Sequence, residues 1–225
     1  MIVVTGASRG LGRAVAERLL ALGLDVCGLS RNGGDTPFTL YQCDVSSFDS
    51  LKKIASDLRA TNKPITGLIN AAGIASMNLA LTTPAHVVNR IVATNLLGTI
   101  YTCQAFAPLM IRGKQGSIVN FSTIAVSLGL KGESVYVASK AGVEGFSRAF
   151  AREMSDFGVR VNCIAPGPID TDLLKGITAV QIEKIVSRQV MQKKFGPDAI
   201  CDLVELLLDK RSASISGQVL HVGGV

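Results

Sequence analysis

Short apolar runs alternate along the chain with longer segments in which apolar residues recur at helical spacing. The runs are rich in Val, Ile and Leu and hold few polar residues, which is typical of strands covered on both faces. The sequence predicts strands at residues 2–5, 25–29, 38–42, 65–69, 117–121, 159–163 and 218–222. It predicts helices at roughly 11–22, 47–61, 84–111, 134–156 and 198–209, with a weaker helical pattern at 177–191.

This alternation predicts an α/β fold: a single doubly wound Rossmann-type domain over residues 1–225, with a parallel sheet of about seven strands. One connection is short, because the sequence RNGGDTP between Ser30 and Phe38 is typical of turns. A parallel crossover through a helix needs about a dozen residues or more. We therefore expect a loop to replace the helix between the second and third strands. Pro108 is expected to bend or end its helix.

Composition narrows the function classes. The net charge is +6, but the basic residues are spread along the chain, so we expect solvated helix faces and no nucleic-acid partner. The five Cys form no CxxC pair and the two His lie far apart, which favours free thiols in a reducing cytoplasm and no metal site. The chain opens directly into a strand without a basic leader, as in a cytoplasmic protein.

An uncharged stretch at residues 91–111 is long enough in principle to cross a bilayer. It contains Asn95, Gln104 and Pro108, among other polar residues, which favours a helix buried on most sides instead. A sheet on one side and another subunit on the other would cover such a helix. We therefore expect no membrane association and a homo-oligomer.

The segment TGASRGLG at residues 5–12 follows the first predicted strand and opens the first predicted helix. Gly6 permits a tight turn, and Gly10 and Gly12 let the backbone approach a pyrophosphate at the helix N-terminus. An ordinary strand-to-helix turn is the alternative, but the context on both sides favours dinucleotide binding.

The second strand ends at Arg31, where an NAD site usually has an acid that holds the ribose hydroxyls. Arg31 and Arg9 together suit a 2′-phosphate, so NADP(H) is favoured, with NAD(H) as the alternative. Asp44 follows the third strand, where it could accept a hydrogen bond from the adenine amine or cap a helix.

Two hydroxyls, Ser122 and Thr123, end the fifth strand, and Tyr136 and Lys140 follow four residues apart on one predicted helix face. A neighbouring ammonium favours a phenolate, so Lys140 is expected to lower the pKa of Tyr136. Such a Tyr can act as an acid or base near neutral pH. Alternation along the strand directs the two hydroxyls to opposite sides, so one of them faces Tyr136.

Six motifs occur in one order: TGASRGLG, NAAG at 70–73, Asn95 in a helix, a strand-end hydroxyl, YVASK and PGPIDT at 166–171. In this the chain resembles the short-chain dehydrogenase/reductase family, in its single-domain branch, and is most like 3-oxoacyl-acyl-carrier-protein reductases. The resemblance runs from Met1 to about Gly224.

The resemblance implies roles for these residues. Tyr136 would exchange a proton with the substrate oxygen, Lys140 would hold the nicotinamide ribose, and Asn95 would bind a water of a proton relay. The family spacing selects Thr123 as the partner of Tyr136, where the family usually has Ser. The implied cofactor-binding residues are Gly6, Ser8, Arg9, Gly10, Leu11, Gly12, Arg31, Asp44, Val45, Asn70, Ala71, Ala72, Gly73, Tyr136, Lys140, Pro166, Gly167, Ile169 and Thr171.

The expected function is NADP(H)-dependent hydride transfer between nicotinamide and a carbonyl or secondary alcohol. The resemblance points to 3-oxoacyl thioesters of acyl carrier protein or coenzyme A, with a substrate lid at about 170–196. It also implies a dimer or tetramer, through the helices at 84–111 and 134–156. Two alternatives stay open: an alcohol, sugar or polyketide dehydrogenase of the same family, and a non-catalytic protein that senses NADP(H).

Overall fold

Parallel strands form the central sheet of the computed structural model, which describes residues 1–170 and 178–225. The described strands follow the order β3-β2-β1-β4-β5-β6-β7. Their bounds are β1 Ile2–Thr5, β2 Val26–Ser30, β3 Thr39–Gln42, β4 Gly67–Asn70, β5 Gly116–Phe121, β6 Val159–Pro166 and β7 Val219–Val222. The predicted parallel α/β sheet is therefore confirmed, and each predicted strand is found within two residues of its expected bounds, except that β6 continues three residues further, to Pro166.

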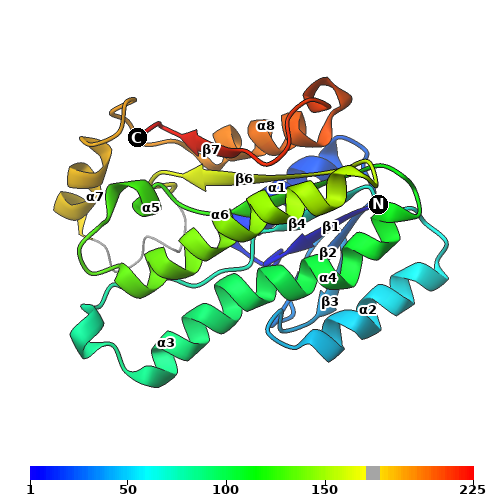
Figure 1. The fold of residues 1–225 in the computed structure, drawn as a ribbon, viewed down its shortest axis with the longest axis horizontal. Coiled ribbons are helices and arrows are strands. Elements are labelled where there is room, and N and C mark those ends of the chain that lie inside the picture. Colours follow the sequence, from blue (N-terminus) through cyan, green and yellow to red (C-terminus); the bar gives the residue numbers. More distant parts are fainter. Residues whose placement is uncertain (171–177) are drawn as a thin grey trace.

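Helices cover both faces of this sheet (Figure 1). One face packs against α1 and α8 around a core that includes Val4, Leu19 and Ile200, and the other packs against α2, α4 and α6 around a core that includes Leu51 and Phe106. Burial on both sides is why the strands read as almost uninterrupted Val, Ile and Leu. The bounds of these helices are α1 Gly10–Ala21, α2 Phe48–Ala60, α4 Gly98–Ile111, α6 Ser134–Ser155 and α8 Pro197–Leu208.

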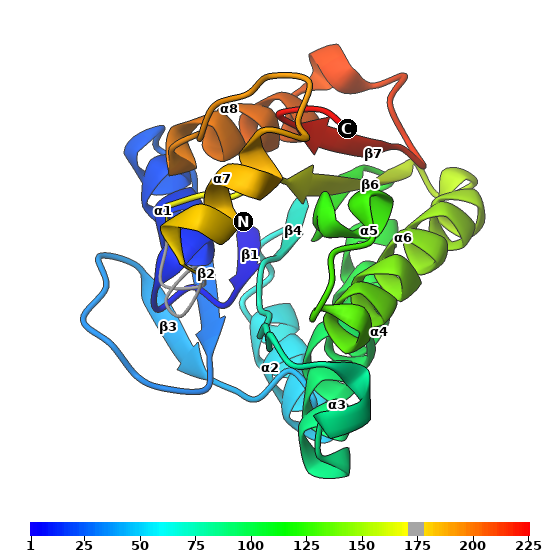
Figure 2. The same ribbon diagram turned by 90° about the vertical axis from the view of Figure 1, so that its left-hand side faces the viewer.

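The strand order reverses between β1 and β4, which lie side by side although β2 and β3 separate them in the chain. A ligand crevice is expected at such a switch point, beside the carboxyl ends of the strands. The connection from Ser30 to Thr39 contains no helix, as predicted. The strands' carboxyl ends point to the left in Figure 1 and face the viewer in Figure 2.

The long helix predicted at 84–111 contains an irregularity that the sequence did not reveal. It consists of α3 (Ala85–Val92), a π-helical turn at Ala93–Leu97, and α4. Of the two effects expected of Pro108, ending the helix is excluded, since α4 continues through Pro108 to Ile111, and bending it stays a prediction. No helix in the described part of the chain is long and apolar enough to cross a membrane.

Short elements surround the carboxyl edge of the sheet. These are α5 (Ala125–Leu128), α7 (Ala179–Val186) and the 3-10 turn at Ala80–Thr82. In Figure 2, α5 and α7 lie in front of the strand ends, with α7 much shorter than the pattern predicted at 177–191. Residues 171–177, which belong to the predicted lid, lie outside the described residues.

Candidate active site

A cavity of about 520 Å³ runs along the carboxyl ends of the strands, from the glycine-rich loop to the start of α6. It joins chain segments that are far apart in the sequence. The predicted site residues that line it are Gly6, Ser8, Arg9, Gly10, Leu11, Gly12, Arg31, Val45, Ala71, Ala72, Gly73, Thr123, Tyr136, Lys140, Pro166, Gly167 and Ile169. Thr171, also predicted to bind cofactor, lies outside the described residues.

The glycine-rich loop has the geometry that a pyrophosphate requires. Gly6 and Gly10 adopt φ values of 69° and 58°, which favour glycine over residues with a side chain. A Cβ at Gly12 would lie 2.5 Å from the carbonyl oxygen of Gly6, so α1 packs against the end of β1 without room for a side chain. Helix α1 begins at Gly10, and its first N–H groups are therefore available to an anion beside the loop.

The end of β2 presents cations to this part of the cavity. Arg9 and Arg31 are exposed and line the cavity, while the hydroxyls of Ser8 and Ser30 share a hydrogen bond of 2.7 Å that holds the loop against β2. No acid among the described residues lines this end of the cavity. The site therefore attracts an anion here and lacks the carboxylate that usually binds a free ribose hydroxyl pair.

Asp44 is not among the residues that line the cavity, and its predicted contact to the adenine amine stays a prediction. Its Oδ1 accepts hydrogen bonds from the backbone N–H and the hydroxyl of Ser46, so the carboxylate stabilises the turn before α2. Helix α2 is instead capped by Ser47, whose hydroxyl accepts from the N–H of Ser50. Val45, the next residue along from Asp44, does line the cavity.

Asn70 is also turned away from the cavity. Its amide is buried and donates hydrogen bonds to Oδ1 of Asn120, at 2.8 Å, and to Sγ of Cys103. Asn120 in turn donates to the hydroxyl of Ser147 on α6. Asn70 therefore joins β4 to β5 and α6 beneath the site, and only its neighbours Ala71 to Gly73 reach the cavity.

The reactive end of the cavity contains a hydroxyl pair between β5 and α6. The side chain of Thr123 forms a hydrogen bond with Tyr136, which lowers the pKa of the phenol. Burial of Tyr136 has the larger effect and raises this pKa, and the charge of Glu133 raises it further. The expectation that the pKa of Tyr136 is depressed is therefore wrong, because desolvation disfavours the phenolate.

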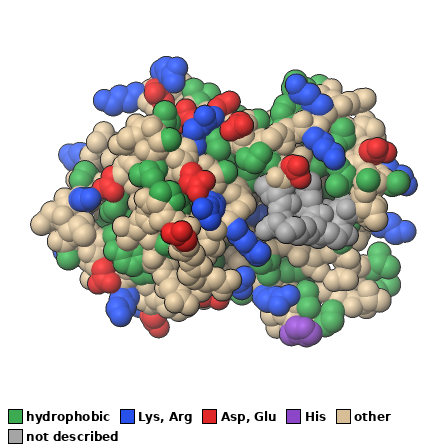
Figure 3. All heavy atoms as spheres, turned by 180° about the vertical axis from the view of Figure 1, so that it is seen from behind, with side chains coloured by type: hydrophobic (Ala, Val, Ile, Leu, Met, Phe, Trp, Pro, Cys, Tyr) green, Lys and Arg blue, Asp and Glu red, His purple; other side chains and the backbone are tan. Residues whose placement is uncertain are grey.

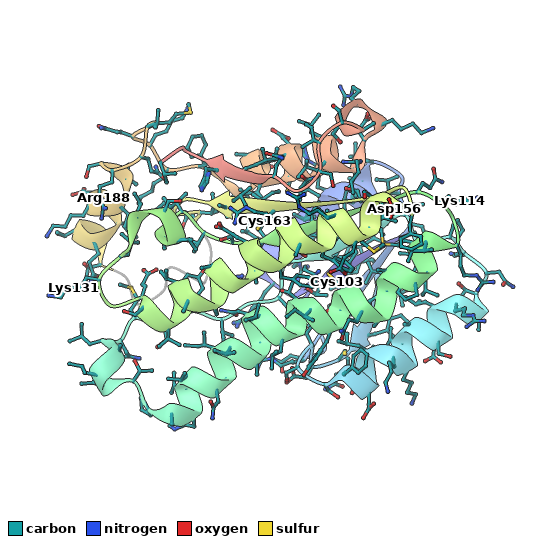
Figure 4. The ribbon with its side chains drawn as sticks, viewed as in Figure 1. Cys103, Lys114, Lys131, Asp156, Cys163 and Arg188 are labelled. Atoms are coloured by element: carbon teal, nitrogen blue, oxygen red, sulfur yellow. The ribbon has the colours of Figure 1, made fainter. Side chains whose placement is uncertain are left out.

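Lys140 lies one helical turn beyond Tyr136 and is buried with its charge. Its Nζ donates a 2.7 Å hydrogen bond to the carbonyl oxygen of Phe121, and it lies near the buried thiol of Cys163, labelled in Figure 4. Burial lowers the pKa of Lys140 to about 8. A Cβ added at Gly73 would lie 3.5 Å from Nζ, so the ammonium packs close to Gly73, and both residues line the cavity.

Asn95 stands in the π-helical turn and is completely buried. Its amide donates to the carbonyl of Ile74 and to the hydroxyl of Ser139, and it accepts from the N–H of Ile74 at 2.8 Å. Both N–H groups of the Asn95 amide thus donate to acceptors of the protein itself. Asn95 positions the Ile74 segment, which lines the cavity, and its predicted contact to a relay water stays a prediction.

Two acids at the start and middle of α6 were not among the predicted catalytic and cofactor-binding residues. Glu144 is buried and accepts a hydrogen bond of 2.7 Å from Ser122, so Ser122 links the end of β5 to α6. Glu133 lines the cavity three residues before Tyr136. Helical spacing from Tyr136 was the available signal for Glu133, but only the fold shows that it faces inward.

A glycine loop at a strand-to-helix turn, with a Tyr–Lys pair at the same sheet edge, defines a dinucleotide-binding oxidoreductase of the α/β class. The chain belongs to the short-chain dehydrogenase/reductase family. Residues 6–224 match the sequence model of a family described as enoyl-(acyl carrier protein) reductase.

Individual relatives agree with this assignment. The chain is 32% identical to the 3-oxoacyl-acyl-carrier-protein reductase FabG of Escherichia coli (strain K12), over 99% of this chain and 95% of that protein. Ligand-free Thermoplasma acidophilum aldohexose dehydrogenase is similar in structure, with TM-score 0.90 and 33% identity, over 99% of this chain and 92% of that one. A 4-hydroxyisoleucine dehydrogenase complexed with NADH has TM-score 0.90 and 25% identity, over 99% and 97% of the two chains.

Proposed function

We propose that this protein is an NADP(H)-dependent oxidoreductase that interconverts a carbonyl compound and a secondary alcohol. One observation carries the proposal: the hydrogen-bonded Thr123 and Tyr136 share a cavity with the glycine-rich loop, and Lys140 lies on the same face of α6. A non-catalytic sensor of NADP(H) would not need these three side chains together.

A bound nicotinamide would supply the hydride for reduction or accept it in the reverse direction. The protein's own side chains donate and accept the proton that accompanies hydride transfer. Because burial raises its pKa, Tyr136 holds its proton at neutral pH and can donate it to a carbonyl oxygen. The hydroxyl of Thr123 can hydrogen-bond to the same oxygen, and the Lys140 ammonium can stabilise the phenolate left on Tyr136.

Arg9 and Arg31 support the choice of NADP(H). Both side chains are exposed at the cavity end that carries no acid among the described residues, where a 2′-phosphate would find two cations. NAD(H) remains the alternative, and the complex of the 4-hydroxyisoleucine dehydrogenase with NADH is the comparison that favours it.

The substrate has two candidate classes. Similarity to FabG favours a 3-oxoacyl thioester carried by acyl carrier protein or coenzyme A. A hydroxylated or amino-bearing ketone or alcohol is the second candidate. The observation that favours it is the presence of Glu133 in the cavity lining, near Tyr136, in a cavity that is also lined by apolar residues such as Leu130 and Ile185. The names of the aldohexose and 4-hydroxyisoleucine dehydrogenases agree with this second class.

Assembly into a homodimer or homotetramer also belongs to the proposal. Apolar side chains on α4 and α6 remain only partly buried in the single chain, including Tyr101, Leu109 and the stacked rings of Phe146 and Phe150. A second copy would cover them. The molecular mass in solution, from light scattering, tests this, and a monomeric mass at working concentration would refute it.

Oxidation of NADPH and NADH, followed with a panel of carbonyl compounds and enoyl thioesters, tests the proposed function. We expect turnover of at least one carbonyl compound, with higher kcat/KM for NADPH than for NADH. Turnover of enoyl thioesters alone would identify the reduction of a carbon–carbon double bond instead. Cofactor binding without turnover of any substrate would support the sensor.

A further inference from the structure

Glu133 is a buried carboxylate at the reactive end of the cavity. Its side chain is among the lining residues, and the residue as a whole is only 8% exposed. Among the described residues that line the cavity it is the only acid, whereas the cations Arg9 and Arg31 belong to the opposite end. Its carboxylate oxygens are not among the fully buried polar atoms without a partner, so they keep contact with the open space of the cavity. A carboxylate in this position is partly desolvated and has no partner, which is costly, so its retention needs a reason.

The backbone around Glu133 explains why the side chain faces inward. Gly129 ends α5 with φ 60°, and Gly132 has φ 87°, so the chain turns back sharply before α6 begins. Glu133 is the N-cap of α6, and its carbonyl accepts from the N–H of Val137. Its side chain makes no capping hydrogen bond, so helix capping does not account for the carboxylate.

No described residue neutralises this carboxylate. Burial alone raises the pKa of Glu133, and no hydrogen bond or nearby charge opposes it. The cations close by are directed elsewhere: Arg188 donates to the carbonyl of Leu128, and Lys131 extends away from the molecule (Figure 4). Lys140 donates to the carbonyl of Phe121.

Glu133 interacts electrostatically with Tyr136, so it lies close to the position where a substrate oxygen would bind. The remaining lining nearby includes the apolar residues Ile74, Met77 and Leu130. A purely apolar acyl chain would leave the carboxylate desolvated and without a partner, whereas a substrate hydroxyl or ammonium would pair with it.

We propose that Glu133 binds a hydrogen-bond donor that the substrate carries next to its reacting carbon, so that the substrate is a hydroxy- or amino-substituted ketone or alcohol. This inference rests on the proposed carbonyl chemistry and narrows its substrate class. The negative charge of Glu133 raises the pKa of Tyr136. A substrate donor bound to Glu133 would partly offset that charge and so lower the pKa of Tyr136. Substrate binding and proton transfer are thereby coupled.

The test compares four substrates in the intact protein with its preferred cofactor. Acetoin carries a hydroxyl beside the carbonyl, aminoacetone an ammonium, butanone neither, and an acetoacetyl thioester represents the acyl class. The variants are Glu133→Leu, which removes the acceptor, and Glu133→Gln, which removes only the charge. Glu153→Gln, at an exposed position of α6, is the matched control.

We expect the unaltered protein to prefer acetoin or aminoacetone over butanone by about tenfold or more in kcat/KM. Glu133→Leu should abolish that preference, mainly through KM. Glu133→Gln should abolish it for aminoacetone and keep much of it for acetoin, which separates an ammonium from a hydroxyl ligand. Glu133→Leu should also raise Tm, because a partly desolvated charge without a partner is removed.

Equal use of butanone and the two donor-bearing ketones would overturn the inference, as would a donor preference that survives Glu133→Leu. In either case the proposed function stands. If none of the four carbonyl compounds is reduced, including the thioester, the proposed function itself fails.

Discussion

Ser122 donates a hydrogen bond of 2.7 Å to Oε1 of Glu144, while the adjacent Thr123 pairs with Tyr136. The two neighbouring hydroxyls that follow β5 thus bind two different residues of α6. Glu144 is buried and also accepts from Arg148 through its second oxygen. Ser122 therefore fastens β5 to α6, and this contact sets the position of Thr123 relative to Tyr136.

Substitution of the two hydroxyls should separate chemistry from stability. Thr123→Val removes the hydrogen bond to Tyr136 and should lower kcat by about 100-fold. Thr123→Ser keeps the hydroxyl and should keep or raise kcat. Ser122→Ala should cost about 1–3 kcal/mol of unfolding free energy, because a buried carboxylate loses a donor, with a smaller effect on kcat. Steady-state kinetics and urea unfolding measure both, and greater loss of kcat in Ser122→Ala would reverse the assignment.

Arg31 should determine the cofactor preference. Arg31→Asp replaces a cation at the end of β2 with an acid, which repels a 2′-phosphate and accepts from free ribose hydroxyls. The ratio of kcat/KM for NADPH to that for NADH should fall by about tenfold or more. Arg152→Asp, at an exposed position of α6, makes the same charge change away from the cavity and should leave the ratio unchanged. An unchanged ratio in Arg31→Asp would show that Arg31 does not contact the phosphate.

Asn95 should act by positioning the segment that begins at Ile74. Its side chain makes a paired contact with the N–H and carbonyl of Ile74, at 2.8 and 2.9 Å. Asn95→Ala should accelerate hydrogen exchange at the Ile74 amide by about tenfold or more, because this N–H loses its acceptor. Unchanged exchange at this amide would show that the contact does not hold the segment.

Burial of Lys140 should make stability depend on pH. Its pKa is lowered in the folded protein to about 8 from 10.5. Between those values the unfolded chain binds more protons at Lys140 than the folded chain, so the contribution of Lys140 to the unfolding free energy rises with pH across this window. This contribution is up to about 3 kcal/mol. The buried thiols act in the opposite sense above about pH 9, because burial raises the pKa values of Cys27, Cys43, Cys103, Cys163 and Cys201 in the folded protein. The raised pKa of Tyr136 does the same above about pH 10.

Urea unfolding from neutral pH to about pH 10 measures this slope. Lys140→Met removes the titrating group and should make the slope of unfolding free energy against pH less positive than in the unaltered protein, whereas Lys210→Met, at an exposed site, should leave the slope unchanged. A Lys140→Met protein with the slope of the unaltered protein would show that Lys140 does not contribute to it.

The sheet was predictable because buried parallel strands leave a strong signal. Runs such as IVVT and SIVNF have apolar residues on both faces, and turn residues around Gly33 showed that a helix could not fit between β2 and β3. The π-helical turn at Ala93–Leu97 could not be foreseen, since it is a shift of backbone hydrogen bonds within a continuous apolar helix.

The parts of the site that could be predicted are those where the backbone or the strand geometry leaves one choice of residue. The glycine loop requires positive φ or close packing, and strand alternation separates Ser122 from Thr123. The predicted site residues that do not line the cavity, Asp44 and Asn70, are those whose orientation depends on local or distant hydrogen-bond partners. Asp44 accepts a hydrogen bond from Ser46, and Asn70 donates one to Asn120. These hydrogen bonds hold the two side chains in place of a contact with the cavity. Predicting the pKa of Tyr136 from charge alone omitted its burial.

The central claim is that Tyr136 transfers the proton to a substrate carbonyl, and Tyr136→Phe tests it most directly. The measurement is the rate of reduced-cofactor oxidation with the best carbonyl substrate, alongside the Kd of the reduced cofactor. We expect kcat to fall by about 100-fold or more while Kd stays within about twofold. A Tyr136→Phe protein that retains most of the original kcat would contradict the account.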